Sequence, residues 1–290
     1  MKVAASMSVG RLAPKHSLDI DGKGTIMQRT YRERKYYCGE YMEVVIFPVY
    51  THAKKRGKRK KPTSEIQQRL NRRHSEGKLR RLLHTNFSYM DTFATLTFDD
   101  AHLPASVEDA QRLLQNFLRR VKRRYGKLGI DPKYIYVLEY GTKHTRLHIH
   151  LVISGGLNKD ELSKLWGLGK ISAEPLRFEQ DGLAALARYL TKGSETGNKA
   201  TWKRWAGSRN LVKPTVTERD GRLSHKKMAN LCLEGGETHY LESQYDGYEM
   251  ADYSPSVGED IYGGYYLAAT LKKKPTSKYI WSGGEIPFWL

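Results

Sequence analysis

The sequence predicts an α+β fold in which helices cover the faces of one mainly antiparallel sheet of about five strands. Three observations lead to this prediction. Short runs of β-branched and aromatic residues alternate with amphipathic stretches at helical spacing, and two of these runs are separated by a loop of hairpin length. The hydrophobic share of 39% also suffices for a core over the middle of the chain.

The expected elements follow from periodicity and from residues that start or stop helices. Ser106, with Asp109 three residues later, is typical of a capping box. Asp181 and Gly193 can cap and stop the last predicted helix. In chain order we expect a strand at 41–50, a helix at 64–83, a strand at 92–98, a helix from 106, paired strands within 133–153, a helix from 158, a short strand at 170–178 and a helix at 181–193.

The ends of the chain differ from its middle. Residues 1–40 lack sustained periodicity and are expected to be disordered, whereas 41–215 form the predicted folded domain, with a basic arm at 53–85. Residues 216–290 are expected to be a C-terminal extension of unknown role. Eight of the 19 tyrosines fall between Tyr240 and Tyr279, so base stacking and an ordinary β-rich extension are both open for this segment.

The charge of the chain indicates a polyanionic partner. Lys and Arg number 50 against 31 Asp and Glu, a formal net charge of +19. Between Lys54 and Lys61, seven of eight residues are Lys or Arg, which is typical of either a solvated loop or an arm along phosphates. An acidic membrane surface is the weaker partner, because no apolar run of 18 or more residues and no signal peptide occur.

Cysteine usage bears on the compartment. Only Cys38 and Cys232 are present, and neither has a zinc-type neighbour pattern. Because two distant cysteines make no disulfide framework, we expect a cytoplasmic protein.

Two histidines two residues apart define the first candidate site. Within the apolar run 147–153, His148 and His150 project from one face of the strand. If Glu139 of the preceding strand lies opposite His148, Val137 lies opposite His150, and the three polar side chains form a metal site with open positions. Taken alone, such a pair is more often two partly buried structural histidines.

A tyrosine and a lysine define the second candidate site. Tyr189 and Lys192 fall off the apolar stripe of the last predicted helix and, being three apart, are neighbours on one helix face. A phenol and an ammonium are therefore presented together. The alternative is a surface tyrosine beside a solvated lysine.

In combination these motifs resemble the HUH endonucleases, specifically the rolling-circle replication initiator (Rep) proteins of plasmids and single-stranded DNA phages. The resemblance covers about residues 43–214 and implies the HUH fold, which is related to ferredoxin-like and RRM sheets. Its carriers, in chain order, are Phe93-Ala94-Thr95-Leu96-Thr97-Phe98 as motif I, Leu147-His148-Ile149-His150 as motif II, Tyr189-Leu190-Thr191-Lys192 as motif III, and the segment Ser208-Arg209-Asn210-Leu211.

The resemblance also implies the chemistry. A divalent ion held by Glu139, His148 and His150 polarises the scissile phosphodiester, and Tyr189, assisted by Lys192, attacks it to leave a 5′-phosphotyrosyl link and a free 3′-OH. Ligand softness suits Zn, Fe or Mn better than Mg, whereas the family implies Mg or Mn, which we adopt as the expected cofactor. The residues to which we assign DNA contacts are Thr95, Thr97, Arg188, Lys58, Arg59, Lys60 and Lys61.

The partners implied are single-stranded or hairpin origin DNA and the polymerase and helicase of a bacterial host. No P-loop motif occurs, so the chain encodes no nucleotide-driven helicase of its own. The sequence sets no oligomeric state.

Two rivals stay open. One is a single-tyrosine HUH transposase, and the other is a non-catalytic basic nucleic-acid-binding protein in which Tyr189 is structural. A relaxase is disfavoured, because its tyrosine precedes the histidines.

Overall fold

The computed structural model describes residues 29–50, 65–140, 146–192, 205–233, 237–257 and 264–275. These residues form two five-stranded antiparallel sheets and six α-helices, which confirms the predicted α+β class. The first sheet has the order β6-β3-β5-β4-β7 and the second has the order β8-β1-β2-β10-β9. The central antiparallel sheet with flanking helices is thus present, but a second sheet accompanies it.

The bounds of the elements are as follows. The strands of the first sheet are β3 (Thr92–Thr97), β4 (Tyr134–Tyr140), β5 (Leu147–Ile153), β6 (Ile171–Pro175) and β7 (Ala206–Gly207). The strands of the second sheet are β1 (Arg29–Cys38), β2 (Tyr41–Tyr50), β8 (Thr215–Asp220), β9 (Tyr248–Val257) and β10 (Tyr265–Lys273). The helices are α1 (Glu65–Asn86), α2 (Val107–Gly126), α3 (Lys159–Trp166), α4 (Ala184–Lys192), α5 (His225–Leu233) and α6 (Glu237–Gln244).

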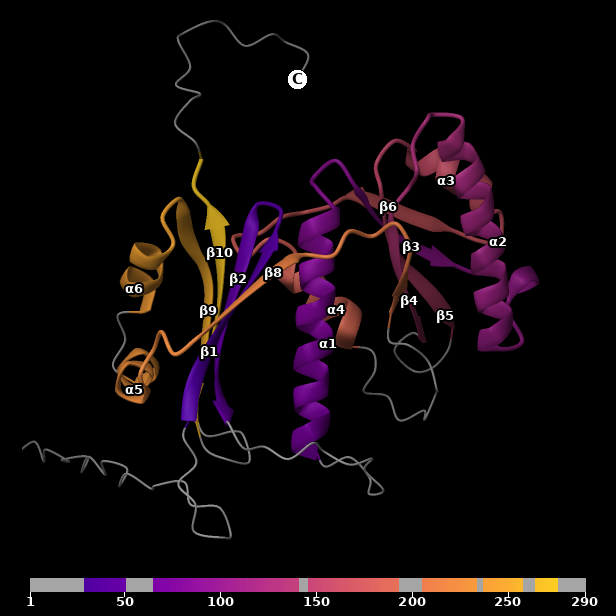
Figure 1. The fold of residues 1–290 in the computed structure, drawn as a ribbon. Coiled ribbons are helices and arrows are strands. Elements are labelled where there is room, and N and C mark those ends of the chain that lie inside the picture. Colours follow the sequence, from indigo (N-terminus) through magenta and orange to yellow (C-terminus); the bar gives the residue numbers. More distant parts are fainter. Residues whose placement is uncertain are drawn as a thin grey trace, which may run out of the picture.

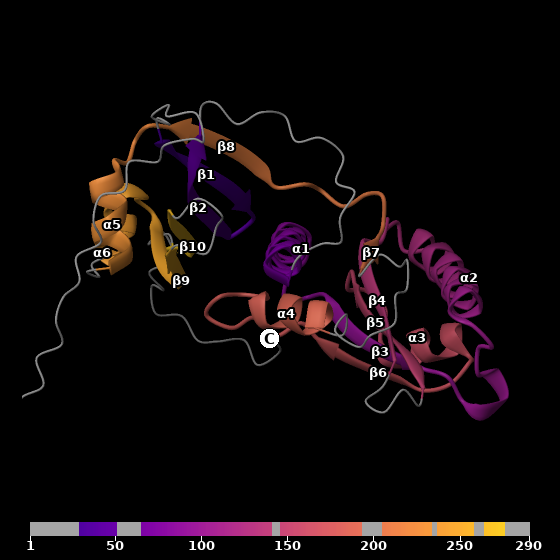
Figure 2. The same cartoon turned by 90° about the horizontal axis from the view of Figure 1, so that it is seen from below.

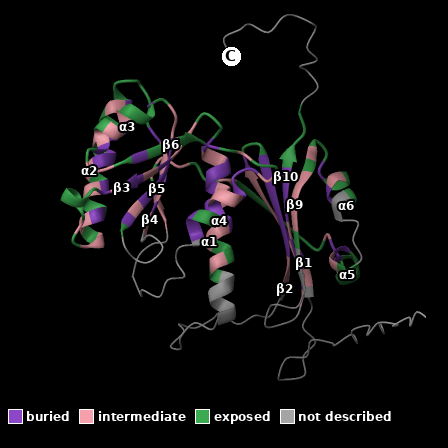
Figure 3. Ribbon diagram, turned by 180° about the vertical axis from the view of Figure 1, so that it is seen from behind, coloured by how far each residue is buried: buried purple, intermediate pink, exposed green. Residues whose placement is uncertain are grey.

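The sheets and helices are arranged in layers. Helices α5 and α6 cover the outer face of the second sheet, α2 and α3 cover the outer face of the first sheet, and α1 and α4 lie between the two sheets (Figures 1 and 2). The buried residues concentrate on the faces where helices meet the sheets (Figure 3). Helix α1 is therefore shared by both halves of the molecule.

Strand β5 shows how the sequence assigns each face of the first sheet. Leu147, Ile149 and Leu151 belong to the core beneath α2 and α3, whereas Val152 belongs to the core beneath α1 and α4. Because successive strand residues point to opposite faces, the even-numbered positions, including both histidines, lie on the α1 and α4 side. The tyrosine helix consequently packs on the histidine face of the sheet.

Helix starts in the first half of the molecule follow the predicted capping chemistry. The Ser106 side chain accepts a hydrogen bond from the Asp109 amide at the start of α2. Asn158 and Glu161 form a complete capping box at the start of α3. The predicted cap of the tyrosine helix is wrong: Asp181 lies in a turn closed by the bridge between Glu179 and Gly182, and α4 begins only at Ala184.

The prediction that the terminus is disordered as far as residue 40 is also wrong in part. Arg29–Cys38 forms the ten-residue strand β1, which pairs with β2 along its whole length. The strand predicted at 41–50 is present as β2, but it lies in the second sheet rather than the first. The division of the chain at residues 41 and 215 stays a prediction.

The segment after residue 215 contributes three strands to the second sheet. Strand β8 pairs with β1, and β10 lies between β2 and β9. The β-rich alternative for this segment is thereby confirmed. Helices α5 and α6 pack their apolar residues on the sheet around Leu267 and Leu271.

Neither cysteine forms a disulfide: Cys38 is buried and Cys232 is half-buried. In the described part of the chain, no helix combines the length and the apolar character needed to cross a membrane.

Candidate active site

The pairing of three strands brings the predicted metal ligands together. Glu139 of β4 lies opposite His148 of β5, and Val137 lies opposite His150, so the predicted register is confirmed. On the other side of β5, Thr97 of β3 lies opposite His148 and Thr95 opposite His150. Because paired residues share a face of the sheet, one carboxylate, two imidazoles and two hydroxyls point toward α4.

Glu139, His148 and His150 form a group that could hold a metal ion. Each offers one ligand atom, and these atoms all lie within 4.8 Å of one another. The Nε2 atom of His150 lies 3.2 Å from Oε2 of Glu139, and the two imidazole centroids are 4.9 Å apart. Two imidazoles and one carboxylate are ordinary ligands for divalent metals.

Electrostatics favour a cation at this position. Burial, aided by the neighbouring His148, lowers the pKa of His150 to about 4. His150 is therefore neutral at physiological pH and keeps a ring nitrogen free to ligate. Among the described residues the ion-pair partner of Glu139 is His150 alone, so this carboxylate has no permanent positive partner.

Thr95 fixes the tautomer of His150. Its Oγ1 atom lies 3.2 Å from Nδ1 of His150. If Nδ1 carries the proton and donates to Thr95, Nε2 is the nitrogen that points toward Glu139. This contact gives Thr95 a part in orienting the imidazole, which sequence reasoning did not foresee.

Tyr189 of α4 completes the cluster. Its hydroxyl lies 3.2 Å from Nε2 of His150, and the two rings are 5.0 Å apart. The residue is 47% exposed, so a substrate can reach it. Burial and the nearby carboxylate of Glu139 raise the pKa of Tyr189 above its usual value. A cation held beside Glu139 would oppose the second of these effects.

Phe93 is a site residue that sequence reasoning missed. Its ring stacks on His150 with centroids 5.8 Å apart and meets Tyr189 edge-on at 6.4 Å. Phe93 thus packs against both rings and limits their movement. Its strand parity with Thr95 was the available signal.

The remaining predicted site residues are distributed as follows. Arg188 points to Glu76 of α1, with Nε and Oε1 3.8 Å apart. The Thr97 hydroxyl donates to the Lys170 carbonyl over 3.2 Å. The side chain of Lys192 and the run Lys58, Arg59, Lys60 and Lys61 lie outside the described residues.

Comparison with protein families agrees with this site. Residues 91–194, which span β3 to α4, match the family model described as Replication-associated protein ORF2. This match supports a replication initiator of the Rep type. It contains all three candidate metal ligands as well as Tyr189. Comparisons with curated proteins and with solved structures found no match.

Proposed function

We propose that this Rep-type protein nicks single-stranded DNA at a replication origin by transesterification and so primes rolling-circle replication. The observation that carries the proposal is the 3.2 Å contact between the Tyr189 hydroxyl and Nε2 of His150, inside the cluster with Glu139 and His148. A nucleophile beside three potential metal ligands is the arrangement that metal-assisted phosphoryl transfer needs.

The ligand group suits Mg²⁺ or Mn²⁺ in this reaction. When bound by Glu139, His148 and His150, such an ion would polarise the scissile phosphate and offset the charge that develops on it. The Nε2 lone pair of His150 can serve either the ion or the Tyr189 hydroxyl, but not both at once. In the ion-bound protein the hydroxyl is therefore released from His150 and available to the phosphate.

Tyr189 is the nucleophile in this proposal. Its oxygen attacks phosphorus, the bond from phosphorus to the 3′ oxygen breaks, and the 5′ phosphate stays on Tyr189. The phenolic proton passes to solvent, and the departing 3′ oxygen takes a proton from solvent to become a free hydroxyl. Lys192 supplies positive charge near the phenolate, while Thr97, Arg188 and the basic run contact the DNA backbone.

One tyrosine on this face limits each site to one transesterification at a time. A second nucleophile one helical turn earlier would stand at Ala185 or Leu186, and neither residue can attack. Termination accordingly needs a second subunit or a water molecule. A host polymerase would extend the 3′ hydroxyl and a host helicase would open the duplex.

A single-stranded oligonucleotide with Mn²⁺ tests the proposal. Mass spectrometry should find a nucleotide adduct on Tyr189, and Tyr189→Phe should form no adduct while it still binds DNA. Tyr89→Phe is the matched control, because Tyr89 is 72% exposed on the loop before β3. An adduct on another tyrosine would refute the assignment of the nucleophile, and the absence of any adduct would favour a non-catalytic DNA-binding protein.

A further inference from the structure

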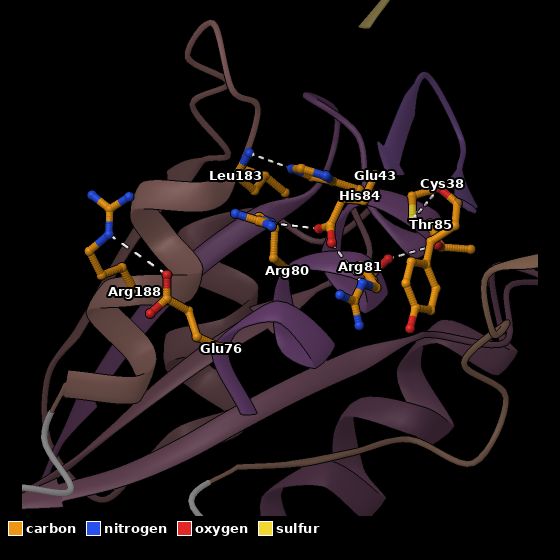
Figure 4. Close-up of polar contacts among 10 residues, drawn as sticks. Cys38, Glu43, Glu76, Arg80, Arg81, His84, Thr85, Leu183 and Arg188 are labelled. Carbon is orange, nitrogen blue, oxygen red and sulfur yellow. Dashed lines mark hydrogen bonds and ion pairs between the residues drawn. The ribbon is translucent and has the colours of Figure 1, made fainter. Parts of the chain in front are cut away.

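The start of the tyrosine helix is held by a histidine from another helix. The Leu183 amide donates a hydrogen bond over 2.9 Å to Nε2 of His84, which lies on α1 (Figure 4). Leu183 directly precedes the first residue of α4, a position where amides have no partner within the helix. His84 therefore takes the part that sequence reasoning gave to Asp181.

His84 is itself fixed by the second sheet. Its ring stacks on Tyr41 of β2, with centroids 4.3 Å apart and planes inclined by 25°. Gly182 completes the contact at a backbone φ of +72°. A Cβ atom there would come within 2.6 Å of His84 Nε2 and 2.8 Å of Tyr41 Cζ, so only glycine allows so close an approach.

The chemistry of His84 matches an acceptor role. Burial lowers its pKa to about 4, so the imidazole is neutral and Nε2 can accept a hydrogen bond. Among the described residues Nδ1 of His84 has no hydrogen-bond partner. A buried unsatisfied nitrogen is a cost that an apolar side chain would avoid, so packing alone does not explain a histidine here.

Helix α1 connects the second sheet to the tyrosine helix at two further points. Arg80 and Arg81 bind the two carboxylate oxygens of Glu43 on β2, at 2.6 and 2.7 Å (Figure 4). On its other side α1 pairs Glu76 with Arg188, the residue before Tyr189. A shift of α1 against the second sheet would thus be passed to α4.

We propose that His84 is a positioning residue for Tyr189, through which the second sheet sets the place of the nucleophile. This inference rests on the proposed function. From Leu183 to Tyr189 the helix rises by about 9 Å, so a tilt at its start displaces the hydroxyl directly. Displacements of about 1 Å at reacting atoms slow enzymes by about a hundredfold.

Two substitutions separate the acceptor from the ring. His84→Phe keeps the stacking on Tyr41 but removes the acceptor, whereas His84→Gln restores an acceptor at the distance of Nε2. With His84→Phe we expect amide exchange in residues 183–190 to quicken about tenfold, the effect of losing one buried hydrogen bond. Exchange in α2 should not change, and His84→Gln should stay close to wild type.

The same variants are compared in nicking. At saturating DNA and Mn²⁺ the single-turnover rate constant of His84→Phe should fall about tenfold or more, while the Kd for DNA stays within about twofold. The matched control is Asn86→Ala, which removes two 2.8 Å hydrogen bonds between α1 and Val212 without touching α4. It should leave both the exchange in residues 183–190 and the nicking rate unchanged.

Two results would overturn the proposal. One is wild-type exchange and nicking in His84→Phe, and the other is an equal loss in Asn86→Ala, which would mean general destabilisation. Failure of the proposed function is distinguishable, because wild-type protein would then form no adduct. Amide exchange would still show whether His84 holds α4.

Discussion

The two sheets treat their buried carboxylates in opposite ways. In the second sheet Glu43 is 1% exposed, and Arg80 and Arg81 bind both of its oxygens. In the first sheet the described residues give Glu139 no guanidinium or ammonium partner, only the neutral imidazole of His150. One cluster completes its own charge balance and the other does not.

This difference teaches how to tell a structural cluster from a ligand site. Glu33, the other buried carboxylate of the second sheet, also has an arginine partner, Arg222, at 3.0 Å. Burying an acid is tolerable when a fixed cation accompanies it. Where that cation is missing, a metal ion can complete the cluster, and the predictions below break or sharpen this contrast.

Loss of a metal ligand should have the largest effect. We expect His148→Ala and His150→Ala each to abolish metal-dependent nicking, and Glu139→Gln to weaken Mn²⁺ binding at least about a hundredfold, because each removes one of three protein ligands. Titration calorimetry with Mn²⁺ measures the affinity. Glu174→Gln on β6 of the same sheet is the control and should bind like wild type. Full affinity in Glu139→Gln would place the third ligand elsewhere.

Breaking the paired cluster should lower stability rather than metal affinity. We expect Glu43→Gln to reduce the free energy of unfolding by about 3 to 5 kcal/mol, because two arginines lose their buried counter-charge. Denaturant titration measures this. Glu40→Gln, which removes an exposed pair with Lys273, should cost at most about 1 kcal/mol. Normal Mn²⁺ binding by folded Glu43→Gln protein would support the contrast.

The Glu43 cluster also predicts a pH dependence. Burial raises the pKa of Glu43, but the two guanidiniums outweigh it and leave the pKa below its usual value. The resulting stabilisation is complete above the unfolded pKa of about 4.3 and is lost as the pH falls through the folded pKa. Glu43→Gln should flatten this acid limb in denaturant titrations, and an unchanged limb would contradict the assignment.

Loss of the Thr95 hydroxyl should have an intermediate effect. Thr95→Val keeps the shape of the side chain but removes the contact with Nδ1 of His150, so we expect Mn²⁺ affinity to fall by about 10 to 100-fold. Thr95→Ser retains the hydroxyl and should bind nearly as well as wild type. Equal affinities for all three proteins would show that Thr95 does not orient the imidazole.

Neutralising the basic run should have the smallest effect on chemistry. Replacing Lys58, Arg59, Lys60 and Lys61 by glutamine should lower the slope of log affinity for single-stranded DNA against log salt by about three, with the nicking rate at saturation unchanged. The control removes as many charges from the exposed face of α2, at Arg112, Arg119, Lys122 and Arg123. A slope that falls only in the α2 variant would mean that the run is a solvated loop.

Local patterns predicted the first sheet, and long-range contacts explain what they missed. The register of Glu139 against His148 could be read from the sequence because side chains alternate along strands and the loop between β4 and β5 is short. Strand β1 was missed because its partner β8 lies about 180 residues away and no local signal reports such pairing. The contact of His84 with Leu183 likewise depends on how α1 packs between two sheets.

The order of the strands in the second sheet has a consequence for synthesis and for truncation. Every described strand of the first sheet has been made by residue 207, whereas β10, which lies between β2 and β9, is completed only at residue 273. On the ribosome, strands β1 and β2 therefore wait for a partner while the nuclease half can already pair. A chain cut before residue 264 would lose an interior strand and expose the edges of both β2 and β9, which are templates for aggregation.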